Sequence, residues 1–461
     1  MTEKTLFEAL KTYNQQHITD HYTNLSAEKQ RQFLEGLQGV NLDIVFKIHE
    51  NFMHKKILPA HFGDIRPASV ISTPKTDEEN ARRENARQLG ESLIRKHETA
   101  VLIVAGGQGS RLGFDGPKGT FPVSPVKGKT LFQLFCESVR AASMRYNTEI
   151  PLLIMTSHEN HHDTLKFFDK HKFFGLSREN VHFFQQGRLP SVTPQGKLIL
   201  KNETGIFENP DGHGGSLKAL HDSGHLTRLI NQGITELFYC QVDNPLATII
   251  DPLFLGYHRM ENAEISTKAV RRKNIDEKVG VCVTVDGKGA IIEYSDMKEE
   301  DMCARDKDGS VLYWAGNTAI HILNLGFIKR LNYHGFALPY HRAVKHIDTI
   351  AHDSKKVKVT GWKFETFVFD AISFAGKACF VEVIREEEFS PVKNKEGVDS
   401  AKTTRADMVN LYKSWLESAG VTAPPDIQVE ISPLFALDRE ELAHKLEGKR
   451  LEIKGDLYLG L

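Results

Sequence analysis

The sequence predicts an α/β fold in which a mostly parallel, Rossmann-like sheet is flanked by helices, between a helical N-terminal domain and a small β-rich C-terminal domain. Apolar residues recur at helical spacings up to about residue 98. Short apolar runs then alternate with amphipathic helices to about residue 388, and strand-like segments lie near the end of the chain. A chain of 461 residues also exceeds the size at which one core usually stops growing. We therefore expect domains at 1–98, 99–400 and 401–461.

The N-terminal domain is expected to consist of helices. Its apolar residues recur at helical spacings: Leu6 and Leu10, then Phe33, Leu34 and Leu37, then Ile44, Val45 and Ile48. Pro59, Pro67 and Pro74 interrupt this pattern, and a very polar helix with the sequence DEENARRENARQLGESLIRK follows.

The middle of the chain alternates between strands and helices, which implies right-handed crossovers and a sheet covered on both faces. The expected strands are Val101–Ala105, Leu152–Thr156, Val181–Phe184, Leu237–Val242, Ile265–Val270, Val279–Val285, Ala290–Tyr294, Ala319–Leu323 and Cys379–Ile384. The expected helices are Thr130–Arg145, Asn160–Asp169, Ser216–Asn231 and Pro252–Asn262. The C-terminal domain is expected to combine a helix at Arg405–Ser418 with the strand-like segments DIQVEISPL and KRLEIKGDLYL. Ligands bind at the carboxyl ends of parallel strands, so we expect functional residues there.

Charge and cysteine content exclude several classes of protein. The 59 Lys and Arg nearly balance the 60 Asp and Glu, so no net field gathers nucleic acid or an anionic membrane. The 5 cysteines are widely spaced without a Cys-x-x-Cys pair, which argues against a disulfide framework and a structural zinc site. No apolar stretch has the length of a signal peptide core or a membrane span. We expect a cytoplasmic protein without nucleic-acid or membrane partners, and its oligomeric state is left open.

The glycine-rich loop Gly106–Gly113, which follows the first central strand, is the most informative segment. Small residues at a strand end, followed by Arg111 and Lys118, provide a backbone cradle for a base and two cations for phosphates. A dinucleotide fingerprint is not matched, because Leu112 stands where the third glycine belongs. A P-loop is not matched either, because Lys118 lies between a proline and a glycine. A plain glycine turn with an incidental arginine remains the alternative.

The segment His158–His162 matches the H-E-x-x-H pattern of zinc proteases. It follows the strand that ends at Thr156, so His158 lies where the next helix begins and not on a helical face. No distal third zinc ligand is evident. We expect a solvated helix start and keep a zinc protease as an alternative.

Other strand ends carry polar groups that suit nucleotide recognition. Gln186 and its neighbour Gln185 offer amides, which donate and accept as the edge of uracil requires, although paired glutamines are usually a surface feature. The loop Asn209–Ser216 is rich in glycine and precedes a helix, so a ligand can approach its backbone, with a simple turn as the alternative. Asp243 follows a buried strand, where nucleotide-bound Mg²⁺ needs a carboxylate, although a turn or helix cap also places an acid there.

Four further residues are candidates with open alternatives. Glu293 and Asn317 lie at strand ends and suit a sugar hydroxyl or an amide, but either alone decides nothing. Lys363 and Lys393 can neutralise phosphates, although Lys393 can equally form surface ion pairs with the acidic residues Glu386–Glu388 that precede it.

Ten short segments follow one another in order over roughly residues 99–420. They are AGGQGSRLG at 105–113, PKG at 117–119, FFGL and FFQQGRLP within 173–190, PDGHGG at 210–215, VDNPL at 242–246, IEYSD at 292–296, AGN at 315–317, FVFD at 367–370 and REEEFSPVKN at 385–394. Together they resemble the UDP-N-acetylhexosamine pyrophosphorylases, a family within the wider UDP-sugar pyrophosphorylases, and the match is specific because the segments agree in order.

The resemblance implies a role for each matching residue. The uracil would be held by the backbone at Ala105, Gly106 and Gly107, with Gln186 and Gly212. Phosphates would be held by Arg111 and Lys118 (the triphosphate), Lys363 (the transferring phosphate) and Lys393 (the sugar phosphate), and magnesium by Asp243. The sugar and its acetyl group would face His213, Glu293, Asn317, Phe367 and Phe369.

The implied reaction joins UTP and N-acetylglucosamine 1-phosphate, with Mg²⁺ as the cofactor, by in-line attack on the α-phosphorus of UTP. Catalysis would rest on positioning and charge neutralisation rather than on a protein nucleophile. His213 departs from the pattern, because eukaryotic members usually have Asn there and the UDP-glucose enzymes carry Gly-His-Gly. A UTP–glucose-1-phosphate uridylyltransferase or a broad UDP-sugar pyrophosphorylase is therefore an alternative. A sensor that binds a UDP-sugar without turnover is another.

Overall fold

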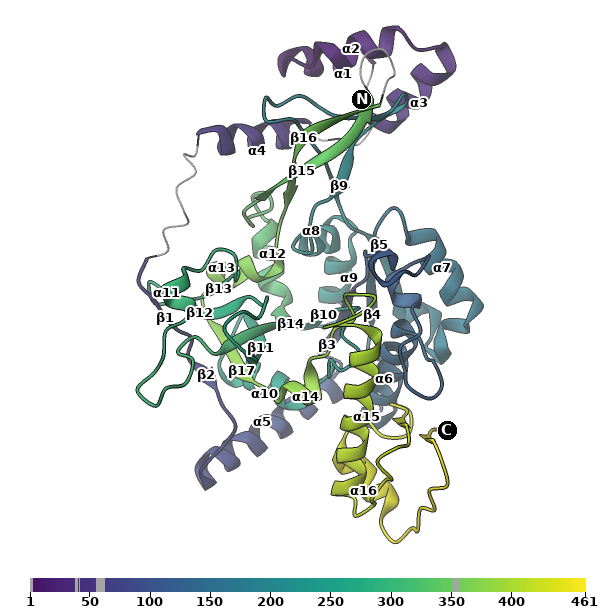
Figure 1. The fold of residues 1–461 in the computed structure, drawn as a ribbon, viewed down its shortest axis with the longest axis vertical. Helices are drawn as coiled ribbons and strands as arrows, with labels where there is room; N and C mark the ends of the chain where they lie inside the picture. The colour runs from purple at the N-terminus through teal and green to yellow at the C-terminus, as the bar shows by residue number, and fades with distance from the viewer. Residues whose placement is uncertain (1–2, 38–39, 41, 55–62, 351–355) are drawn as a thin grey trace. The chain divides into compact units, whose positions relative to one another are not determined.

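The computed structural model describes residues 3–37, 40, 42–54, 63–350 and 356–461 (Figure 1). The chain divides into two compact units, each discontinuous in sequence. Unit 1 comprises Met1–His61, Gln186–Lys218 and Ala337–Asp370, and unit 2 comprises Phe62–Gln185, Ala219–Phe336 and Ala371–Leu461. The expected domains at 1–98, 99–400 and 401–461 are continuous in sequence and divide the chain differently, so their boundaries stay a prediction.

An eleven-stranded sheet forms the centre of unit 2 and confirms the expected α/β class. Its main path has the order β2–β17–β11–β14–β10–β3–β4–β5. These strands are β2 (Val70–Ile71), β17 (Ala378–Glu382), β11 (Ile265–Arg271), β14 (Ala315–Asn324), β10 (Glu236–Gln241), β3 (Thr99–Val104), β4 (Leu152–Thr156) and β5 (Val181–Gln185). Neighbours pair in parallel except at β14, which is antiparallel to both β11 and β10. The parallel strands therefore share one carboxyl edge, and β14 begins at that edge.

A short antiparallel extension joins this sheet through β14. It consists of β1 (Ile65–Pro67), β12 (Val281–Val285) and β13 (Lys288–Ile292). Its buried apolar side chains Val281, Val283 and Ile292 form a small cluster with Met297 and Tyr313.

Helices surround the sheet of unit 2 (Figure 1). They are α5 (Asp77–Arg95), α6 (Leu131–Tyr146), α7 (His161–Lys170), α9 (His225–Asn231), α10 (Pro252–Met260), α11 (Glu299–Met302), α12 (Leu325–Asn332), α13 (Ala371–Phe374), α14 (Arg385–Glu388), α15 (Ala401–Ser418) and α16 (Arg439–Leu446). Single 3-10 turns are η1 (Ser110–Leu112), η2 (Lys118–Thr120), η3 (Lys172–Gly175) and η4 (Arg178–Asn180).

The polar helix α5 packs within unit 2, directly against α10. A Cβ at Gly90 would lie 1.8 Å from the carbonyl oxygen of Pro252, and one at Gly256 would lie 1.7 Å from that of Ala86. The two helices can therefore approach to backbone contact only because glycine stands at both crossing positions.

The C-terminal segment shares its core with the large sheet. Met408, Leu416, Val429 and Leu442 belong to the same buried cluster as Val101 and Ile103 of β3. The strands β18 (Val429–Ile431) and β19 (Leu457–Leu459) pair in parallel but are short. Because α15 and α16 are longer than both strands, this segment is less rich in β-structure than the sequence indicates.

Unit 1 combines the N-terminal helices with two later segments of the chain. Its elements are α1 (Glu3–Thr12), α2 (Gln16–Thr23), α3 (Ala27–Leu37), α4 (Leu42–His54), β6 (Arg188–Pro190), β7 (Leu200–Asn202), β8 (Gly205–Ile206), β9 (Glu208–Pro210), the long antiparallel pair β15 (His341–Ile350) and β16 (Lys356–Glu365), and η5 (Val368–Asp370). One apolar core joins Leu10, Ile18 and Phe33 of the helices to Leu198 and Phe364 of the later segments. Gln15 is buried between them, where its amide nitrogen donates to the Gly196 carbonyl oxygen (2.9 Å) and its amide oxygen accepts from the Leu198 amide (2.8 Å).

One expected helix is divided. The predicted helix Ser216–Asn231 consists of α8 (Gly215–Asp222) and α9, separated at Gly224, which has φ +78°. Glycine adopts this left-handed conformation at little cost, so the helical pattern of the sequence hides a turn. No helix among the described residues has the length and apolar character needed to cross a membrane.

Candidate active site

The glycine-rich loop leaves the carboxyl end of β3 and closes on itself. The amide of Lys118 donates to the carbonyl oxygen of Gly107 (3.0 Å), and that of Gly109 donates to Gly116 (2.9 Å). Ala105 is buried, whereas Gly107 is exposed, and a Cβ at Gly107 would meet nothing within 4 Å. The backbone beyond β3 therefore borders open space that a flat base can enter.

Asn160 holds this loop in place, although the sequence analysis did not single it out. Its fully buried amide nitrogen donates to the carbonyl oxygens of Ala105 (2.9 Å) and Gly107 (3.2 Å). Its amide oxygen accepts from the amide of Ser157 (2.8 Å). The signal available in the sequence was an asparagine in the short turn between β4, the strand that pairs with β3, and the following helix.

The H-E-x-x-H segment does not form a metal site in the part of the chain that the structure describes. No group of three or more His, Cys, Asp or Glu side chains is arranged there to hold an ion. His158 lies on a turn before α7, which begins only at His161, and the ring Nδ1 of His161 lies 2.7 Å from the hydroxyl of Thr156. The expected solvated helix start describes this segment better than the zinc-protease alternative.

Two of the predicted charged residues at the carboxyl edge form an ion pair. Lys118 Nζ lies 3.1 Å from Asp243 Oδ2, and the two side chains are only 16% and 17% exposed. Asp243 follows β10, and Lys118 ends the loop that follows the neighbouring β3, so two adjacent parallel strands bring them together. Arg111 lies on η1 in the same loop and is exposed.

Lys393 belongs to a segment that is bonded directly to Asp243. The amide of Val392 donates to the carbonyl oxygen of Asp243 (2.8 Å). Lys393 Nζ lies 3.6 Å from Asp399 Oδ2 and 5.7 Å from the centre of the Phe389 ring. This ammonium is 44% exposed, so its pairing with Asp399 is weak and it can turn to a phosphate.

Glu293 and Asn317 lie on either side of Gly280. The amide of Asn317 donates to the Gly280 carbonyl oxygen (2.8 Å), and a Cβ at Gly280 would lie 3.3 Å from Glu293 Oε1. Asn317 is buried at the start of β14, where its side-chain oxygen accepts from the amide of Ala319 (2.9 Å). Its amide nitrogen is then the donor that this side chain can offer to a ligand.

The other predicted residues belong to unit 1, where two loops pack backbone to backbone. The carbonyl oxygen of Asp211 accepts from the amide of Thr366 (2.7 Å), whose own carbonyl oxygen accepts from Gly214 (2.9 Å). Gly212 has φ +87°, and a Cβ there would lie 2.3 Å from the Thr366 carbonyl oxygen. Only glycine fits this position. Gln186 is buried directly after β5.

His213, Phe367 and Phe369 form an aromatic cluster in unit 1. The His213 ring lies 5.3 Å from that of Phe367 and 5.8 Å from that of Phe369, and the two phenylalanine rings stack at 5.2 Å. His213 Nδ1 accepts from the amide of Val368 (3.2 Å), which places the ring proton on Nε2. Burial lowers the pKa of His213 to about 4, so the ring is neutral at physiological pH.

Lys363 is paired within its own strand. Its ammonium contacts the carboxylate of Glu365, two residues further along the same face of β16, and the side chains are 23% and 26% exposed. A phosphate bound here would have to share this lysine with Glu365.

Asp243 fits a site for a magnesium ion that is bound mainly by the phosphates of a nucleotide. Mg²⁺ at nucleotide sites is held by one or two carboxylates, phosphate oxygens and water. Asp243 supplies a hard oxygen donor of the kind that such a site uses.

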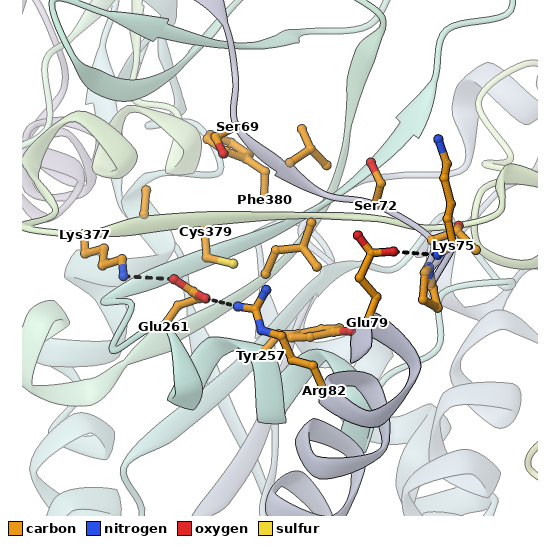
Figure 2. Close-up of a pocket in the computed structure, with 15 residues that line it drawn as sticks. Ser69, Ser72, Lys75, Glu79, Arg82, Tyr257, Glu261, Lys377, Cys379 and Phe380 are labelled. Carbon is orange, nitrogen blue, oxygen red and sulfur yellow. Dashed lines mark hydrogen bonds and ion pairs between the residues drawn. The ribbon is translucent and has the colours of Figure 1, made fainter. Parts of the chain in front are cut away.

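A separate cavity of about 540 Å³ in unit 2 contains none of the predicted residues (Figure 2). It lies beside the N-terminal half of β17 and the start of α5. Glu261 bridges two of its cations, contacting Arg82 and lying 2.9 Å from Lys377 (Figure 2). These charges are already compensated, so we assign this cavity no ligand.

Comparisons with known proteins agree over most of the chain. A sequence model of the UTP–glucose-1-phosphate uridylyltransferase family matches residues 46–458. The chain is 34% identical to the UDP-N-acetylglucosamine pyrophosphorylase of Saccharomyces cerevisiae, covering 96% of each protein. It is 33% identical to a probable UDP-N-acetylglucosamine pyrophosphorylase of Dictyostelium discoideum, covering 94% of each.

Solved structures give the same result. The uridine diphosphate N-acetylglucosamine pyrophosphorylase of Trypanosoma brucei superposes with a TM-score of 0.84 at 26% identity, over 100% of this chain and 99% of that one. A putative UDP-N-acetylglucosamine pyrophosphorylase of Entamoeba histolytica superposes with a TM-score of 0.76 at 30% identity, over 86% of this chain and 100% of that one.

Proposed function

The chain belongs to the UTP–glucose-1-phosphate uridylyltransferase family, and we propose that it joins UTP and N-acetylglucosamine 1-phosphate to give UDP-N-acetylglucosamine and pyrophosphate. It is a nucleotidyltransferase by family and by the names of its relatives. The observation that carries the proposal for the site is the pairing of Lys118 with Asp243 at the carboxyl edge of the sheet, beside the exposed glycine-rich loop.

The chemistry follows from the charges of the reactants. An oxygen of the sugar phosphate attacks the α-phosphorus of UTP, the bond from that phosphorus to the bridging oxygen breaks, and pyrophosphate leaves. Both reactants are polyanions, so the protein must supply cations to bring them together. It needs no nucleophilic side chain of its own, because the sugar phosphate is the nucleophile. Arg111 and Lys118 serve the triphosphate, Lys393 the sugar phosphate and Lys363 the transferring phosphate. The weak pairing of Lys393 and the exposure of Arg111 support these roles.

We assign a magnesium ion to Asp243. Bound with UTP, the ion would offset the negative charge that develops on the phosphate oxygens. Asp243 also holds Lys118 by the ion pair, so this carboxylate orients one of the cations.

Nucleotide and sugar recognition are assigned to separate groups. The backbone of Ala105, Gly106 and Gly107, with Gln186 and Gly212, binds the uracil. Glu293, Asn317 and His213 bind the sugar, and Phe367 and Phe369 supply an apolar wall for the acetyl group. The stacking of the two phenylalanine rings supports the last assignment.

We also propose a cytoplasmic location. Cys136, Cys240, Cys282, Cys303 and Cys379 are all free thiols. A chain that carries five cysteines without a disulfide suits a reducing compartment.

The decisive experiment measures pyrophosphate release from UTP and Mg²⁺ with N-acetylglucosamine, N-acetylgalactosamine and glucose 1-phosphates in parallel. We expect the highest kcat/KM with N-acetylglucosamine 1-phosphate. A preference for glucose 1-phosphate would favour the alternative that His213 indicates, a UTP–glucose-1-phosphate uridylyltransferase. Tight binding of a UDP-sugar without pyrophosphate release from any pair would identify a sensor and overturn the proposal.

A further inference from the structure

Lys268 on β11 is a fully buried ammonium to which neither the sequence nor the proposed reaction assigns a role. Its Nζ lies 2.8 Å from Asp251 Oδ2 and 2.6 Å from Glu388 Oε1, and it donates to the carbonyl oxygen of Thr248 (3.2 Å). Lysine is almost never fully buried unless it is paired. Burial alone would lower the pKa of Lys268, but the two carboxylates raise it above its ordinary value, so the group is charged.

Its partners connect two segments that carry proposed site residues. The second carboxylate oxygen of Glu388 accepts from the amide of Thr248 (3.0 Å), and its backbone carbonyl accepts from the side chain of Asn244 (2.7 Å). Asn244 in turn accepts from the amide of Ser390 (3.0 Å). Asn244 directly follows Asp243, and Ser390 lies three residues before Lys393.

A third segment meets Lys268 through its backbone. The hydroxyl of Thr318 donates to the carbonyl oxygen of Lys268 (2.8 Å), next to Asn317 on β14. The pairing of β11 with β14 shifts register between Thr267 and Ala269, so Lys268 stands at a bulge. Bulges re-aim side chains and are common beside functional sites.

We propose that Lys268 is a positioning residue. Through Asp251 and Glu388 it holds the segment that carries Asp243 in register with the segment that carries Lys393. The Asp243 carboxylate and the Lys393 ammonium are then placed to act on the bound substrates together. This inference rests on the proposed function of Asp243 and Lys393. Lys268 itself is fully buried, so we assign it no contact with a substrate.

The chain offers a matched control for a purely structural role. Lys129 and Glu137 form a second buried ion pair in unit 2, 2.5 Å apart, with side chains 6% and 7% exposed. Lys129 also donates to Ser432, so this pair fixes α6 to the C-terminal segment and contacts no proposed site residue. Glu388→Gln and Glu137→Gln each remove one carboxylate charge and keep the side-chain shape.

The test compares these variants by Mn²⁺ binding to the UTP-bound protein, read from the EPR signal of free Mn²⁺, and by steady-state kinetics. For Glu388→Gln we expect Mn²⁺ affinity to fall about 10-fold or more, as for residues that orient a metal ligand. KM for the sugar phosphate should rise and kcat should fall, while KM for UTP changes little. Glu137→Gln should lose stability but keep wild-type Mn²⁺ affinity and kcat per folded molecule.

The triple variant Lys268→Met/Asp251→Asn/Glu388→Gln guards against a failure to fold. It neutralises the ammonium and both of its carboxylate partners together, and replacing a whole buried ion cluster by neutral groups of similar size is often tolerated. We expect the same weak Mn²⁺ binding. If Glu388→Gln and the triple variant bind Mn²⁺ like wild type, or if Glu137→Gln weakens binding equally, the inference is wrong. A wild-type protein that binds Mn²⁺ with UTP but releases no pyrophosphate would contradict the proposed function instead.

Discussion

The side-chain amide of Asn160 donates a hydrogen bond to the backbone carbonyl oxygen of Ala105, 2.9 Å away, and so ties the turn after β4 to the loop after β3. We expect Asn160→Ala to destabilise the protein by about 1–3 kcal/mol, because buried polar groups of the loop lose their partner. The freed loop should raise KM for UTP more than KM for the sugar phosphate. Denaturant titration and kinetics at varied UTP measure both effects.

Asn180→Ala is the control for this prediction, because Asn180 is only half-buried and its side-chain amide donates to the exposed carboxylate of Glu149 (2.6 Å). It should leave both KM values unchanged. Equal effects of the two substitutions would show that Asn160 has no special role in UTP binding.

Gly107 and Gly212 are expected to respond differently to alanine. A Cβ at Gly107 meets nothing within 4 Å, so Gly107→Ala should fold normally and raise KM for UTP by filling the space assigned to the base. A Cβ at Gly212 meets the Thr366 carbonyl oxygen at 2.3 Å with φ +87°, so Gly212→Ala should be destabilised by about 2 kcal/mol or more. Thermal unfolding and UTP kinetics separate the two outcomes.

Gly455→Ala is the matched control for Gly107→Ala, because its Cβ also meets nothing within 4 Å. It should change neither stability nor KM. A wild-type KM for UTP in Gly107→Ala would remove this loop from the nucleotide site.

The sheet could be predicted because its strands are continuous apolar runs. All six residues of β3 are buried, and such a run, followed by an amphipathic helix, is typical of a parallel strand. The pair β15 and β16 was missed, although Lys356–Glu365 alternates partly between polar and apolar residues. The turn η5 and the four-residue helix α13 that follow β16 are too short to show an amphipathic pattern, so the crossover pattern gave no support.

The site could be predicted only in part, for a physical reason. Asp243 and Lys118 follow adjacent strands, so their proximity follows from sheet topology. Asn160 and Lys268 act through backbone groups and buried partners, which depend on loop geometry that no short motif encodes. Within unit 1, Gly212 meets Thr366 across more than one hundred residues of sequence, which the local pattern does not reveal.

Arg111 is expected to act on charge that develops during the reaction. We predict that Arg111→Ala lowers kcat by about 100-fold or more, as for a group that stabilises transition-state charge. The side chain is exposed, so stability should not change. Arg178→Ala, at a residue whose side chain is 75% exposed and pairs with Asp169, is the control and should keep wild-type kcat. Wild-type turnover in Arg111→Ala would refute the role.

Acid should destabilise the protein through His182. Burial, with Arg228 and His225 nearby, lowers its pKa from 6.5 to about 4. Below pH 6.5 the unfolded chain therefore binds a proton that the folded chain excludes, so stability falls as the pH drops towards 4 and this contribution then levels off. The free energy of unfolding of the wild type falls between pH 7 and pH 5. We expect this fall to be about 2 kcal/mol smaller in His182→Gln, since each pKa unit is worth about 1.4 kcal/mol.

Denaturant titrations at several pH values measure this slope. His162→Gln is the control, because His162 is exposed in the folded chain. An unchanged pH dependence in His182→Gln would contradict the prediction.

His213 is expected to influence the choice of sugar. Asparagine in its place can still accept from the amide of Val368, as His213 Nδ1 does at 3.2 Å, but it lacks the ring that lies 5.3 Å from Phe367. Without the imidazole ring, more apolar space beside Phe367 is open to the acetyl group. We predict that His213→Asn raises the preference for N-acetylglucosamine 1-phosphate over glucose 1-phosphate about 10-fold, the effect of a small apolar contact. Ratios of kcat/KM for the two sugar phosphates measure it, and a shift towards glucose 1-phosphate would show that the ring itself helps to bind the acetyl group.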